Sequence, residues 1–163
     1  MDKTEFLKLT VEIFEFYGFI KIGNQFFLDL DRMIVRVYRM GARFSPGEYC
    51  FAYNICFKDI HEDYHFETNE DYKNMPEDLG ILKYLNTVEV INRNGKIIKN
   101  PVNFLPSDYT EKKWIELWKE TLHRTFDPYK DHFEKHVKEN LAPENLGMNI
   151  SAYKEFVKRN IIF

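Results

Sequence analysis

The chain has 163 residues, enough for one domain, and 23 Lys and Arg against 26 Asp and Glu give a formal net charge of −3. Leu, Ile, Val and Phe account for 49 residues, well above the roughly one-fifth share below which disorder is expected. These figures exclude a disordered chain and a collagen-like repeat, and they argue against a basic nucleic-acid binder. We expect a single α+β domain over residues 1–163.

The cysteine content and the N-terminal residues indicate the compartment. Cys50 and Cys56 are too few for a disulfide framework, and on one strand they would lie too far apart to form a disulfide bond. The N-terminus lacks the apolar run of a signal peptide, and no stretch reaches the roughly 18–20 apolar residues of a membrane span. We expect a cytoplasmic protein with free thiols and no membrane partner.

The first half of the chain predicts a helix followed by an antiparallel meander. Residues 2–17 show helical spacing of apolar residues, with a capping-box pattern at Asp2 and Glu5 and a glycine, Gly18, at the end. Strands are expected over 19–22, 25–30, 33–40 and 49–57. The last alternates strictly, which places the following side chains on a helix-covered face: Tyr49, Phe51, Tyr53, Ile55 and Phe57.

The second half predicts a hairpin and then helices. Asn94-Gly95 is a strong two-residue turn signal between strands 88–92 and 96–99. Three helices are expected to follow. The first is capped by Asp108, the second begins at Asp127-Pro128 and ends at Pro143 and Gly147, and the third is capped by Ser151. The predicted fold is α+β: an N-terminal helix, an antiparallel sheet of about four to six strands, and C-terminal helices packed mainly on one face.

Several short motifs carry a resemblance to a known family. They are Gly18-Phe19 after the opening helix, the strand from Ile34 to Tyr38, the aromatic-x-x-N-[IL] element Phe51-Ala52-Tyr53-Asn54-Ile55, and the tryptophan-bearing helix with Lys113-Trp114 and Trp118. In these motifs and their order the chain resembles a bacterial family of small cytoplasmic proteins classed as a domain of unknown function. The resemblance implies an α+β fold; it brings no established activity and no catalytic residues.

Residues 59–80 form the most distinctive segment of the sequence. They hold eight acidic residues and one lysine, a net charge of −7. One interpretation is a mobile, solvated loop. The other is a docking surface for a basic protein partner, since single-sign patches steer association. On this second interpretation the protein is a non-enzymatic, protein-binding module with an immunity- or antitoxin-like role, and the candidate binding residues are Glu62, Asp63, Glu67, Glu70 and Asp71.

The same segment contains an H-E-x-x-H pattern, His61-Glu62-Asp63-Tyr64-His65. On a helix, His61 and His65 would share a face and bind zinc, with Glu62 as general base, so a small zinc-dependent hydrolase is the alternative function. No third ligand is evident at the usual spacing, and the surrounding residues favour turns. His132 and His136, also four residues apart, would complete a four-histidine site.

No other motif predicts catalysis. No serine lies in a G-x-S-x-G frame, and no glycine-rich run would cradle a phosphate, so we expect no catalytic residue and no cofactor. The arginines at 32, 36, 39 and 43 are interpreted as scattered surface charge. Asn54, unusual within a strand, is expected to form a hydrogen bond with a neighbouring loop.

Overall fold

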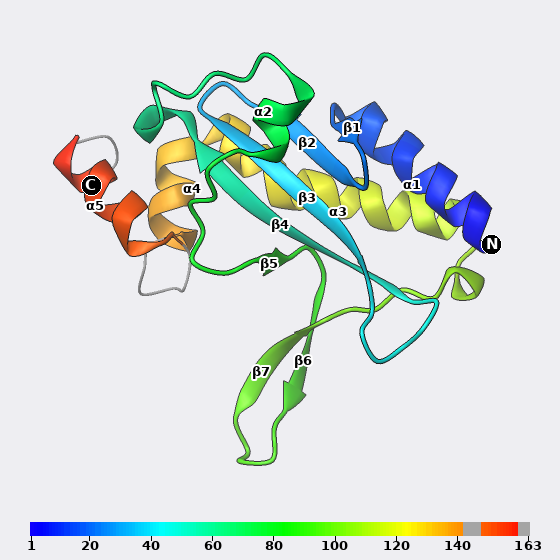
Figure 1. Cartoon of the computed structure of the whole chain (residues 1–163). Helices are drawn as coiled ribbons and strands as arrows, with labels where there is room; N and C mark the ends of the chain where they lie inside the picture. The colour runs from blue at the N-terminus through cyan, green and yellow to red at the C-terminus, as the bar shows by residue number, and fades with distance from the viewer. Residues whose placement is uncertain (142–147, 160–163) are drawn as a thin grey trace.

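The computed structural model describes residues 1–141 and 148–159 and shows an α+β fold (Figure 1). Helix α1 (Lys3–Tyr17) precedes a five-stranded antiparallel sheet in the order β1-β2-β3-β4-β5; its first four strands are the predicted meander, and the short β5 was not predicted. The strands are β1 (Ile20–Ile22), β2 (Gln25–Asp29), β3 (Met33–Gly41), β4 (Tyr49–Phe57) and β5 (Lys83–Tyr84). The fold is therefore an antiparallel meander that one helix precedes and the C-terminal helices follow in the sequence.

Helix α1 begins and ends where the local sequence predicts. The Glu5 backbone N–H donates to Asp2 Oδ1 at 2.9 Å, and the Asp2 N–H donates back to Glu5 Oε2 at 3.0 Å, which is a complete capping box. Gly18 adopts a φ of 119°, which disfavours any other residue, and ends the helix. Phe6 and Phe14 on the inner face are fully buried against the sheet.

The predicted alternation of β4 is confirmed. Its odd-numbered aromatic side chains lie in the main core, between the sheet and helices α1 and α3 (Glu111–Asp131). Phe51 is 2% exposed, and its ring centroid lies 4.6 Å from that of Trp118 and 6.1 Å from that of Phe14. The tryptophan helix and the N-terminal helix therefore share one core with the sheet.

Three helix boundaries near the C-terminus differ from the prediction. Thr110, rather than Asp108, caps α3, because residues 106–108 form the short 3-10 helix η2 (Pro106–Asp108). Pro128 lies inside α3 and does not start a new helix; the buried Phe126 and Tyr129 hold both sides of it in the core, and the break comes at His132. Helix α4 (Phe133–Asn140) follows directly.

The last helix, α5 (Ile150–Lys158), is capped by Asn149, so Ser151 is not the cap. The Ala152 backbone N–H donates to the Asn149 side chain at 2.8 Å. Phe156 is buried against Phe57, whereas Val157 is 42% exposed. The predicted break at Pro143 and Gly147 lies outside the described residues.

Residues 59–80, here called the acidic segment, pack on the second face of the sheet, although most of their acidic side chains stay exposed to solvent. The segment begins within the 3-10 helix η1 (Lys58–Ile60) and contains helix α2 (Asn69–Lys73), which lies over the strands in Figure 1. The reason is a second apolar cluster between segment and sheet. Its members are Ile22, Phe27, Ile34, Cys56 and Met75, with Tyr64, Phe66 and Tyr72 packed against them.

A separate two-stranded ribbon projects from the body of the protein, which is the five-stranded sheet with its helices. Strands β6 (Thr87–Ile91) and β7 (Ile97–Pro101) pair with each other around the predicted Asn94-Gly95 turn. Figure 1 shows the ribbon extending away from the sheet. It exposes four apolar side chains, those of Val88, Ile91, Ile97 and Ile98. Within the part of the chain that the structure describes, no helix has the length and apolar character needed to cross a membrane.

Candidate functional site

Arg36 fastens the acidic segment to the sheet. Its side chain is only 11% exposed, so the prediction of a surface charge is wrong for this residue. Its Nη1 donates to Glu77 Oε1 at 3.2 Å, its Nη2 donates to the Lys73 carbonyl, and its Nε donates to Gln25 Oε1 at 3.0 Å. The Tyr38 hydroxyl also donates to Glu77. Because a buried guanidinium needs these acceptors, the bonds hold residues 73–77 in place.

Two further carboxylates of the acidic segment, those of Asp59 and Asp71, form contacts that stabilise the fold. Asp59 lies 2.7 Å from the Arg32 guanidinium. Asp71, one of the candidate binding residues, completes the capping box of α2 with Thr68: its Oδ2 accepts from the Thr68 backbone N–H at 2.6 Å and from the Glu67 N–H at 2.9 Å. These hydrogen bonds lower the pKa of Asp71. Asp71 therefore has a structural role at the start of the helix; the Thr68-x-x-Asp71 spacing is a capping-box pattern that was not among the predictions from the sequence.

The other four candidate binding residues face solvent. The Glu62 and Glu70 side chains are 74% and 72% exposed; Glu62 pairs with Arg159 at 3.4 Å and Glu70 with Lys73 at 3.2 Å. Exposed pairs of this kind contribute little stability. Asp63 and Glu67 are exposed and form no side-chain ion pair within residues 1–141 and 148–159. These four exposed carboxylates therefore lie on a segment that is packed against the sheet. We call Glu62, Asp63, Glu67 and Glu70 the acidic surface.

A recess opens in this surface. It has a volume of about 290 Å³. Its lining residues are Ile60, His61, Glu62, Asp63, Tyr64, Pro76 and Arg159. Glu62 in this lining is already paired with Arg159, whereas Asp63 has no ion pair among the described residues; Asp63 and the Tyr64 ring make the recess suited to a cationic group. Sequence reasoning found the acids but not the recess, because Pro76 and Arg159 approach it from distant parts of the chain.

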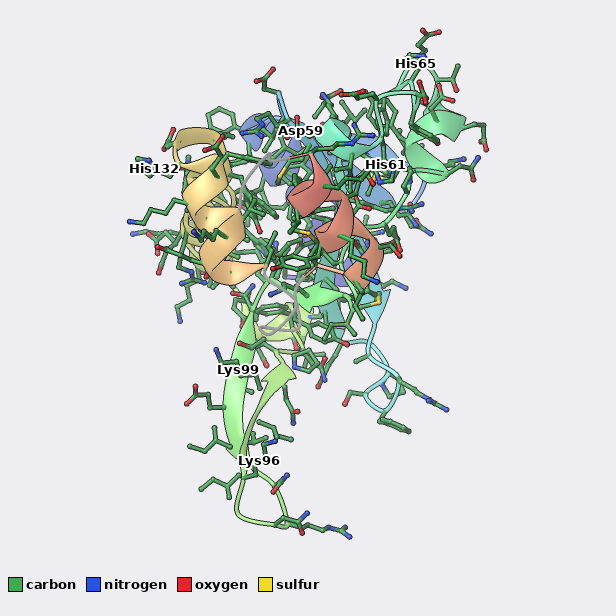
Figure 2. The ribbon with its side chains drawn as sticks, turned by 90° about the vertical axis from the view of Figure 1, so that its left-hand side faces the viewer. Asp59, His61, His65, Lys96, Lys99 and His132 are labelled. Carbon is green, nitrogen blue, oxygen red and sulfur yellow. The ribbon has the colours of Figure 1, made fainter. Side chains whose placement is uncertain are left out.

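The helix that the H-E-x-x-H pattern needs is not formed at residues 61–65. His61 ends η1, and the following residues adopt a turn and extended backbone. His65 is exposed, and Figure 2 shows it at the outer end of the segment, away from His61. The two histidines therefore do not share a helix face.

The proposed four-histidine arrangement is not assembled either. Figure 2 shows His132 on the side of the molecule away from His65. His136 packs against the Tyr129 ring, with centroids 4.5 Å apart, and its Nδ1 lies 3.2 Å from Asn140 Nδ2. Burial lowers the pKa of His136, which favours its neutral form.

His61 instead meets two residues that the motif does not contain. Its Nε2 lies 2.8 Å from Asp78 Oδ1, and one ligand atom each from Cys56, His61 and Asp78 all lie within 4.8 Å of one another. The Phe57 backbone N–H donates to Asp78 Oδ2 at 2.7 Å. Asn54 Oδ1 accepts from the Leu79 N–H at 3.1 Å, which confirms the predicted contact with a loop. The sequence offers no local signal for this cluster, since its members are 5 and 17 positions apart.

The cluster does not activate its cysteine as a nucleophile. Burial, and to a smaller extent the Asp78 carboxylate, raise the pKa of the Cys56 thiol to about 12. Cys50 and Cys56 are both free, as predicted, and both are buried.

Comparison with protein-family models, with curated proteins and with solved structures finds no match for this chain.

Proposed function

We propose that this protein is a non-enzymatic, protein-binding module that engages a basic protein through the acidic surface. The observation that carries the proposal is the recess of about 290 Å³ lined by Glu62, Asp63 and Tyr64. Its volume lies just below the roughly 300–1,000 Å³ of pockets that hold drug-sized ligands, so it suits the end of one Lys or Arg side chain. Glu67 and Glu70, the remaining carboxylates of the acidic surface, add negative charge to the same segment.

The support beneath the acidic surface favours this use. Arg36, the second apolar cluster and the capping box at Thr68 and Asp71 hold the segment against the sheet. A surface that is already ordered loses little conformational entropy on binding. The segment's charge of −7 would also accelerate encounter with a cationic partner. Neutralisation of a basic toxin or nuclease, the immunity- or antitoxin-like role, is one form of this function.

The test compares two charge-matched variants. The first replaces the acidic surface: Glu62→Gln, Asp63→Asn, Glu67→Gln and Glu70→Gln. The control removes four exposed acids from α1 and α3: Glu12→Gln, Glu15→Gln, Glu116→Gln and Glu120→Gln. Both variants are used as baits beside the wild type in cell extract, and any captured partner is then purified for binding kinetics.

We expect the wild type and the control to bind the same basic protein and the acidic-surface variant to lose it. The loss should come mainly from a lower association rate that responds less to salt. Equal recovery and equal association rates with both variants would exclude the acidic surface as the binding site.

A further inference from the structure

We propose that Cys56, His61 and Asp78 bind one zinc ion between the end of β4 and the acidic segment. The three side chains come from different parts of the chain and meet on the second face of the sheet. This ligand set is distinct from the H-E-x-x-H pattern, with which it shares only His61. The inference does not depend on the acidic surface being a docking site.

The spacing of the donor atoms suits a divalent ion. Zinc bonds of about 2.0–2.3 Å place the ligands of a tetrahedral site roughly 3.5 Å apart. Here the three ligand atoms lie within 4.8 Å of one another, and His61 Nε2 and Asp78 Oδ1 are 2.8 Å apart. Small side-chain movements therefore form the site: the His61–Asp78 pair opens slightly as the ion replaces the hydrogen bond, and the Cys56 sulfur approaches.

The chemistry of the donors favours zinc. Sulfur, imidazole nitrogen and carboxylate oxygen are all zinc ligands, and three protein ligands leave a fourth position for water. Cys56 and Asp78 are 0% and 3% exposed. A thiolate and a carboxylate together neutralise the double charge of the ion, which is what a buried site requires. Binding releases the Cys56 thiol proton to solvent, and His61 takes the tautomer with its proton on Nδ1.

The surroundings hold the ligands in position. Asp78 is fixed by its Oδ2, which accepts from the Phe57 N–H at 2.7 Å, and by its own backbone N–H, which donates to the Ile55 carbonyl at 2.7 Å. Such outer hydrogen bonds orient metal ligands. His61 is the more accessible member, with a side chain 27% exposed. The His61 side chain is therefore the ligand that can move to complete the coordination of the ion.

His61 also provides the entry path. Of the three ligands, only His61 lines the recess, where Glu62 and Asp63 contribute negative charge. Arg159 also lines the recess, but its guanidinium is paired with Glu155 at 2.6 Å and Glu62 at 3.4 Å. A cation drawn into the recess would reach the cluster past the His61 ring. Once bound, it would join the strand to the acidic segment and stabilise the folded state.

The test is a titration of the purified full chain with Co²⁺, a spectroscopic substitute for zinc. We expect one equivalent to bind with the visible bands of a tetrahedral site and a thiolate-to-cobalt charge-transfer band, and we expect Zn²⁺ to remove both. Cys56→Ala should abolish the charge-transfer band and weaken binding at least tenfold. Cys50→Ala is the matched control, a buried cysteine on the same strand outside the cluster, and should bind as the wild type does.

Two histidine variants separate the new site from the H-E-x-x-H pattern. His61→Gln should weaken Co²⁺ binding at least tenfold, whereas His65→Gln should leave it unchanged. Because His61 is partly exposed, its replacement also serves if Cys56→Ala does not fold, which tryptophan fluorescence would show. Absence of stoichiometric binding, unchanged binding in His61→Gln, or an equal loss in His65→Gln would each overturn the proposal.

Discussion

The Tyr17 hydroxyl donates a hydrogen bond to Asp127 Oδ1 at 2.6 Å and joins the last turn of α1 to α3 across 110 residues of sequence. Lys130 lies over the Tyr17 ring, 4.1 Å from its centroid, and His123 Nδ1 lies 2.8 Å from Asp127 Oδ2. Burial and the Asp127 carboxylate raise the pKa of Tyr17, so its hydroxyl stays protonated and donates. This hydrogen bond holds α1 and α3 together beside the core.

Tyr17→Phe should lower the free energy of unfolding at neutral pH and make that free energy less dependent on pH in the acid range. Although burial acts to raise it, hydrogen bonds from Tyr17 and His123 hold the pKa of Asp127 below its ordinary value. A depressed carboxyl pKa stabilises the fold above the unfolded-state pKa, and this contribution is lost as pH falls through the folded-state pKa. We expect a loss of about 1 kcal/mol at neutral pH that shrinks in acid, measured by urea unfolding. Tyr84→Phe, on an exposed side chain, should change neither quantity.

Arg36→Ala should loosen the acidic segment. It leaves Glu77 and the Lys73 carbonyl without their buried donor, so we expect a loss of about 2–4 kcal/mol in urea unfolding. Amides of residues 72–78 should exchange hydrogen faster than the rest of the fold. Arg93→Ala, at the exposed turn of the ribbon, is the control and should cost less than about 0.5 kcal/mol. Equal protection of residues 72–78 in both variants would contradict the anchoring role.

Phe51→Ala should cost about 3–5 kcal/mol, because it leaves a cavity among rings that cannot fully close. The ring is 2% exposed and lies near Trp118 and Trp114, at centroid distances of 4.6 and 6.3 Å. Tryptophan fluorescence during urea unfolding measures the change. Phe44→Ala, with a side chain 87% exposed, should be nearly neutral. A cost below about 1 kcal/mol at Phe51 would show that this face is not the packed one.

Removing the ribbon should leave the body folded. Strands β6 and β7 pair only with each other among the described residues, and the Val102 N–H to Asn86 carbonyl bond, at 3.0 Å, closes their base. Replacing residues 88–100 by Gly-Gly should change the free energy of unfolding by less than about 1 kcal/mol, because the deleted side chains are mostly exposed. Near-ultraviolet circular dichroism of the core tryptophans should be retained. Loss of that signal would mean that the ribbon supports the core.

The sequence by itself determined the features that depend on neighbouring residues. The Asp2 and Glu5 capping box, the turn at Asn94-Gly95 and the two faces of β4 each involve positions within a few residues of one another. Their geometry follows from backbone dihedral angles and from the period of a helix or a strand. For the same reason, the sequence showed where the negative charge is concentrated.

Only the tertiary structure decided which partners those acidic side chains contact. Arg36 and Glu77 are 41 positions apart, and His61 and Asp78 are 17 apart; no local pattern encodes either pair. The acidic segment packs because Tyr72 and Met75 cover apolar side chains on the second face of the sheet, such as Phe27. Pro128 stays within α3 because buried neighbours outweigh its local preference to begin a helix. In each case, burial of side chains brought together by the fold overrides the propensity of the segment itself.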